Sequence, residues 1–125
     1  MKIRVLAILA GLAVDFVGST LFVVAVALLV TVFGRQSTFD GALTGVTGLL
    51  VVYWIGLAFT LFGAYITATL SKPHCVLNTA LFGILSTLPS WLFISWYPLW
   101  FTLLCVFTIF PLSVAAGRAV AAGTV

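Results

Sequence analysis

The stretch VLAILAGLAVDFVGSTLFVVAVALLVTVF, residues 5–33, contains one charged residue, Asp15. A helix needs about 20 apolar residues to cross the ~30 Å hydrocarbon core of a bilayer. This run is longer than that, and it lacks the alternation of apolar and polar residues that marks a barrel strand. We interpret it as a transmembrane helix that tilts or projects beyond the hydrocarbon.

The composition of the whole chain agrees with a membrane protein. Of the 125 residues, 64% are hydrophobic and only 6% are charged, whereas a soluble domain carries roughly 25% charged residues. The net charge of +3 comes from five Lys and Arg residues, which lie near the ends of apolar segments. We therefore expect the lipid bilayer as the first partner and no nucleic-acid binding.

Three further apolar segments follow the first one. With the first helix at about 4–33, they predict helices at about 41–71, 74–95 and 97–121. Ser37, with Asp40 three residues later, fits a capping box for the second helix. The predicted fold is all-α, an integral membrane antiparallel four-transmembrane-helix bundle that forms a single transmembrane domain over residues 1–125.

The Lys and Arg residues predict the orientation of this bundle. If the N-terminus is cytoplasmic, four of the five basic residues lie on the cytoplasmic side and only Arg35 lies outside, which agrees with the positive-inside rule. The four are Lys2, Arg4, Lys72 and Arg118. Trp91, Trp96, Tyr97 and Trp100 then form an aromatic belt at the outer interface. We expect both termini in the cytoplasm.

Small residues recur on the predicted helices at helical spacing. Within lipid, helices attract one another by close backbone approach, which small residues permit. The candidate packing residues are Gly11 and Gly18 on the first helix, Gly45, Gly48, Gly56 and Gly63 on the second, and Ser113, Ala116 and Gly117 on the fourth. We interpret them as packing positions within one protomer, with a homo-oligomer interface as the alternative.

Asp15 lies about ten residues into the first helix, which is ~15 Å of rise and close to the bilayer midplane. An ionised carboxylate facing lipid there would cost several kcal/mol, so Asp15 must face the interior, be paired or be protonated. Residues at matching depth are Ser19, Thr60, Ser86 and Thr108. These residues form a candidate intramembrane ion or proton site. The alternative is a hydrogen-bonded Asp15 that fixes the register of the helices.

His74 and Asn78, four residues apart on the third helix, are a candidate polar entrance from the cytoplasm; alternatively His74 is an ordinary interfacial residue. Beyond Thr20, the inward positions toward the outside are mostly Val, Leu and Phe, with Tyr53 the main polar exception. There is no second His and no Glu to complete a metal site, and no nucleophile and base at convergent depth. We expect no metal, no cofactor and no enzymatic activity.

The segment LAVDFVGST, residues 12–20, resembles the first helix of small multidrug resistance transporters, whose membrane-embedded acid binds protons and drugs. The resemblance implies that role for Asp15, where that family has Glu. The pattern VD-x-x-GS at 14–19, with GAYITATLSKP at 63–73 and NTALFGILS at 78–86, is similar to a group of small four-helix bacterial inner-membrane proteins. This second resemblance implies a bacterial inner (plasma) membrane location and four spans, and carries no activity.

Two classes of function remain. The sequence favours a structural or accessory subunit that acts through helix packing with itself or with a larger membrane partner. Short loops and the missing polar path to the outside offer little machinery for transport. The alternative is an oligomeric proton- or cation-linked small transporter or channel with Asp15 as the intramembrane site.

Overall fold

The computed structural model describes residues 3–34, 45–92 and 95–123. The first long helix has three consecutive parts, α1 (Val5–Ala13), η1 (Val14–Gly18) and α2 (Ser19–Phe33). The other long helices are α4 (Val46–Leu70), α5 (Cys75–Leu92) and α6 (Leu99–Ala121). All four are long and apolar enough to cross a membrane. The predicted all-α bundle of four membrane-spanning helices is confirmed, and the chain is a multi-pass membrane protein.

The helix bounds follow the apolar runs with small differences. Helix α5 ends at Leu92, three residues before the expected end, and α6 starts at Leu99 directly after Pro98, which cannot donate a backbone hydrogen bond. Helix α4 begins at Val46. The expected capping box of Ser37 and Asp40 lies outside the described residues, as do Lys2 and Arg35.

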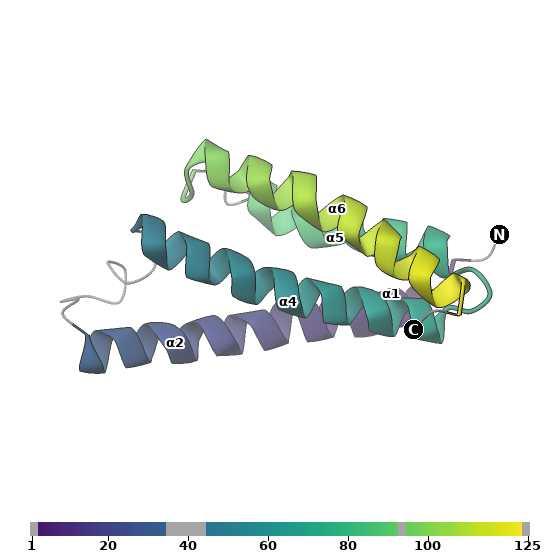
Figure 1. The fold of residues 1–125 in the computed structure, drawn as a ribbon, viewed down its shortest axis with the longest axis horizontal. Coiled ribbons are helices and arrows are strands. Elements are labelled where there is room, and N and C mark those ends of the chain that lie inside the picture. The colour runs from purple at the N-terminus through teal and green to yellow at the C-terminus, as the bar shows by residue number, and fades with distance from the viewer. Residues whose placement is uncertain (1–2, 35–44, 93–94, 124–125) are drawn as a thin grey trace.

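Both termini and the α4–α5 connection lie at the same end of the bundle (Figure 1). We call this end the Arg4 end and the opposite end the far end. At the Arg4 end, the backbone N–H of Arg4 donates to the Asn78 side-chain oxygen at 2.8 Å, and the Arg4 guanidinium donates to the Leu70 carbonyl at 3.2 Å. Val120 of α6 packs there against Cys75. The four helices are therefore tied together at the Arg4 end.

Helices α1 and α4 approach each other closely at Gly11 of α1 and Gly63 of α4. A Cβ atom added to Gly63 would lie 2.6 Å from the Gly11 carbonyl oxygen and 3.0 Å from the ring of Phe82 on α5. Phe82 is fully buried. One turn nearer the Arg4 end, the Thr67 hydroxyl donates to the Ala7 carbonyl at 3.2 Å. Three helices thus meet around Phe82 without space between them.

The remaining candidate glycines have different surroundings. Gly18 faces the ring of Phe59, whereas a Cβ atom on Gly56 would meet nothing within 4 Å. Gly45 is exposed just before α4, and Gly48 is half-buried. Gly83, outside the candidate set, lets α5 approach Ser113 of α6. The glycines of α4 therefore do not form one continuous packing surface.

Candidate functional site

Asp15 lies in the π-helical turn η1, where the backbone winds more widely than in the helices on either side. Such turns are frequent at functional sites. The Ser19 hydroxyl donates to the Asp15 carbonyl oxygen. The Asp15 side chain is 4% exposed, and its carboxyl oxygen Oδ1 accepts a hydrogen bond of 2.8 Å from the Thr60 hydroxyl of α4. The carboxyl group therefore points into the bundle.

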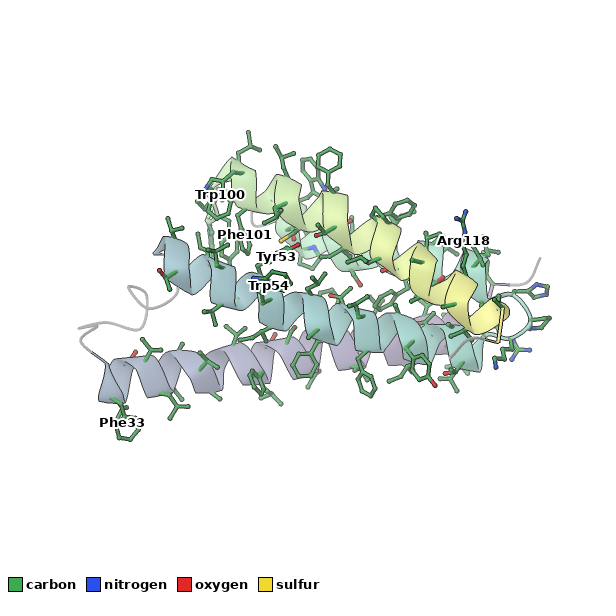
Figure 2. All side chains as sticks on the ribbon, viewed as in Figure 1. Phe33, Tyr53, Trp54, Trp100, Phe101 and Arg118 are labelled. Carbon is green, nitrogen blue, oxygen red and sulfur yellow. The ribbon has the colours of Figure 1, made fainter. Side chains whose placement is uncertain are left out.

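A cavity of about 230 Å³ starts at this carboxyl group and receives residues from all four helices. Its lining on α4 includes Thr60, Gly56 and Tyr53, which are successive helical turns toward the far end. On α6 it includes Phe101, which packs with Tyr53 in the far half of the bundle (Figure 2). The cavity therefore extends from the middle of the bundle toward the far end.

The polar groups near Asp15 are few. Ser86 of α5 is 6% exposed and lines the same cavity. Its hydroxyl faces the Asp15 carboxyl but lies outside hydrogen-bonding geometry, and it has no other hydrogen-bond partner among the described residues. None of the described residues that line the cavity is Lys, Arg or His. The Asp15 carboxyl thus has no cationic partner in this part of the chain.

The structure brings three of the four expected neighbours of Asp15 to the cavity. Ser19, Thr60 and Ser86 line it with Asp15. Thr108 does not line it, and its hydroxyl donates to the Leu104 carbonyl of its own helix at 2.7 Å. The candidate site is therefore built by η1, the start of α2, α4 and α5.

The candidate polar entrance has a different arrangement from the one expected. Asn78 is fully buried and its amide is engaged at both ends, since Oδ1 accepts from the Arg4 N–H and Nδ2 donates to the His74 carbonyl at 2.8 Å. The first N–H groups of a helix lack partners within the helix, and Asn78 supplies one for the start of α1. Between Asn78 and Asp15, Phe82 fills the interior. This side chain and the glycine crossing close the Arg4 half of the bundle.

Four residues of the far half were missed as site residues by sequence reasoning: Ser90, Tyr97, Phe101 and Cys105. The depth of Asp15 selects residues near the midplane, whereas these four lie nearer the far end, where the sequence singled out Tyr53 as the main polar residue. The wall of the cavity instead comes from α4, α5 and α6. Ser90 is one turn after Ser86 on α5, and this spacing is the signal that could have identified it.

Comparisons of this chain with protein-family models, with curated proteins and with solved structures find no match.

Proposed function

We propose that the protein is a small carrier for protons or another small cation, with Asp15 as its binding residue. One observation supports this best: a buried carboxyl group lies at the inner end of a membrane-embedded cavity, with no cationic residue among the described lining. An isolated ionised carboxylate at this depth is costly, and a bound cation would compensate its charge. Asp15 is suited to hold a cation and release it again.

A carrier fits the geometry better than a channel. The cavity reaches Asp15 from the far half, whereas Phe82 and the Gly11–Gly63 crossing fill the Arg4 half. An open pore would need space on both sides of the carboxyl group. Transport would therefore require a change in helix packing around Asp15, and we propose the π-helical turn as the place where the first helix bends. By the positive-inside rule we assign the Arg4 end to the cytoplasm. The resemblance to small four-helix bacterial proteins supports the bacterial inner membrane as the location.

An accessory role is the second candidate, because α2 buries very few of its side chains against the other helices. Within Ser19–Phe33 only Ala27 is buried, and large side chains such as Leu21, Leu29 and Phe33 are exposed. Lipid covers such a surface in a monomer, and a second membrane protein or a second copy would cover it in a complex. Stoichiometric recovery of a larger membrane protein after gentle extraction from the native membrane would favour this candidate.

Asp15→Asn is expected to abolish cation-linked flux while the bundle remains folded. The amide has the shape of the carboxyl group and still accepts from Thr60, but it cannot carry the negative charge. The measurement is proton movement into liposomes that contain the purified protein, driven by an imposed cation or pH gradient. Asp40→Asn removes the only other acidic side chain and is the matched control, with flux expected at the wild-type level.

Flux that is equal in the wild type and in folded Asp15→Asn would contradict the carrier proposal. So would a wild-type protein that is folded in liposomes and moves neither protons nor other cations under any gradient.

A further inference from the structure

A second site lies at the Arg4 end, in a groove between the start of α1 and the end of α4. We infer that this groove binds one anionic phospholipid, with the lipid phosphate at the Arg4 guanidinium and part of an acyl chain along the groove. The inference is independent of the carrier proposal, because none of the residues that line the groove lines the Asp15 cavity.

The groove is a surface feature of about 420 Å³ with mostly apolar walls. Leu6 of α1 is 82% exposed and Leu70 of α4 is 52% exposed, so both walls face the surrounding membrane. Between them Ala7 is buried, and its carbonyl accepts from the Thr67 hydroxyl of α4 at 3.2 Å. This contact closes the floor of the groove, so a ligand there stays on the outside of the bundle.

Arg4 provides a positive charge at a fixed place in the groove. Its backbone N–H donates to the Asn78 side chain at 2.8 Å, and its guanidinium donates to the Leu70 carbonyl of the opposite wall at 3.2 Å. A guanidinium has five N–H donors, and this bond uses one of them. The planar group is suited to bind two phosphate oxygens at once. The side chain is therefore in position across the groove before a ligand binds.

The distribution of charge around the groove favours an anion. Within the described parts of the chain, every Lys and Arg belongs to the Arg4 end of the bundle, namely Arg4, Lys72 and Arg118 (Figures 1 and 2). The one acidic residue in these parts, Asp15, is buried in the middle of the bundle. Basic residues beside a transmembrane helix attract anionic lipids, and basic pockets between such helices bind phosphate headgroups. Charge complementarity therefore supports an anionic headgroup.

The apolar walls favour a lipid over a free phosphate ion. Val5 and Leu6 follow Arg4 along α1, and with Leu70 they line the groove. The ends of a membrane-spanning helix lie near the level of the lipid headgroups. A phosphate bound at Arg4 would therefore have its acyl chains beside these three side chains, whereas a free phosphate ion would make no contact with them.

The test is the retention of phospholipid by the purified protein, measured by native mass spectrometry. The protein in a nonionic detergent is mixed with equal amounts of phosphatidylglycerol and phosphatidylcholine that have identical acyl chains. We expect one phosphatidylglycerol per chain, retained about fivefold or more over phosphatidylcholine, the ratio for one basic residue near an anionic headgroup. Inorganic phosphate at the same concentration should not displace it. Displacement would show a phosphate site without a role for the lipid chains and would overturn the inference.

Three variants test the position of the lipid. Arg4→Gln should remove the preference for phosphatidylglycerol, while the new amide can still donate to the Leu70 carbonyl. Arg118→Gln is the matched control, because it removes one charge from the same end of the bundle outside the groove, and it should keep the preference. Leu6→Glu places a negative charge in the groove from an exposed position. It should abolish retention without changing Arg4, so it decides the question if Arg4→Gln does not fold.

The outcomes separate binding in the groove from a general attraction to the charged end. Loss of the preference in Arg4→Gln and Leu6→Glu, with retention in Arg118→Gln, would support the inference. An equal loss in Arg4→Gln and Arg118→Gln would overturn it, and so would unchanged retention in Leu6→Glu or equal retention of the two lipids by the wild type. Asp15→Asn should retain phosphatidylglycerol as the wild type does, whether or not the protein is a carrier.

Discussion

Gly63→Ala is expected to destabilise the folded bundle by about 1–3 kcal/mol, the usual range for overpacking of a tight interior. The added Cβ atom would lie 2.6 Å from the Gly11 carbonyl oxygen, which belongs to the backbone of a neighbouring helix and cannot rotate away. The α1–α4 crossing would have to widen, and attraction between membrane helices depends on this close approach. The measurement is the unfolding free energy in mixed micelles with increasing SDS.

Gly56→Ala is the matched control, because it makes the same chemical change seven residues earlier on the same helix. Its Cβ atom would have no neighbour within 4 Å. Ala is a better helix former than Gly by up to about 1 kcal/mol, so stability should be unchanged or slightly higher. Equal destabilisation by both substitutions would contradict the assigned crossing.

Phe82→Ala is expected to have the second large effect. Phe82 is fully buried where α1, α4 and α5 meet. Within a bilayer the side chain gains little from leaving water, so its contribution is close packing, and the resulting void should cost about 2 kcal/mol or more. Phe107→Ala is the control, since Phe107 is 73% exposed on α6 and faces outward. The same SDS unfolding measurement compares them.

The Phe82 substitution also has an expected functional consequence. The void would connect the Asp15 cavity with the Arg4 half of the bundle, so protons should move down an imposed pH gradient faster in liposomes with Phe82→Ala than in liposomes with the wild type. Phe82→Leu keeps most of the side-chain volume, so its stability and its rate of proton movement should be close to those of the wild type. If folded Phe82→Ala lets protons through no faster than the wild type does, residues other than Phe82 close the Arg4 half of the bundle.

The pairing of Asp15 with Thr60 was accessible from the sequence, because residues at equal depth below the same membrane surface lie at the same level of the bundle, whichever direction their helices run. Depth does not give direction around the helix axis. Thr108 lies at the expected depth, yet its hydroxyl bonds to the Leu104 carbonyl one turn back on α6, as a Thr in an apolar helix often does. Equal depth is therefore enough to predict Thr60 as a neighbour of Asp15, but not to predict which way Thr108 points.

The cavity itself could not be predicted from the sequence. It depends on how far the helices separate beyond the Gly11–Gly63 crossing, and the two glycines Gly56 and Gly63 carry no signal that distinguishes open space from close contact. The π-helical turn at Asp15 was equally hidden, because the apolar pattern of residues 5–33 fits a continuous α-helix. The hydrogen bond from the Arg4 backbone N–H to the Asn78 side chain was hidden as well, because the apolar pattern does not give the exact residue at which α1 starts.

The most direct test is to measure from which side of the membrane a reagent can reach the cavity. Ser86→Cys and Thr79→Cys, in a chain without Cys75 and Cys105, place one thiol in the cavity and one in the closed half of the same helix. A membrane-impermeant, positively charged thiol reagent is added to vesicles of known orientation. We expect Ser86→Cys to react only when the reagent is on the side of the far end, and Thr79→Cys to react from neither side. Reaction of Ser86→Cys from the Arg4 side, or from no side, would contradict it.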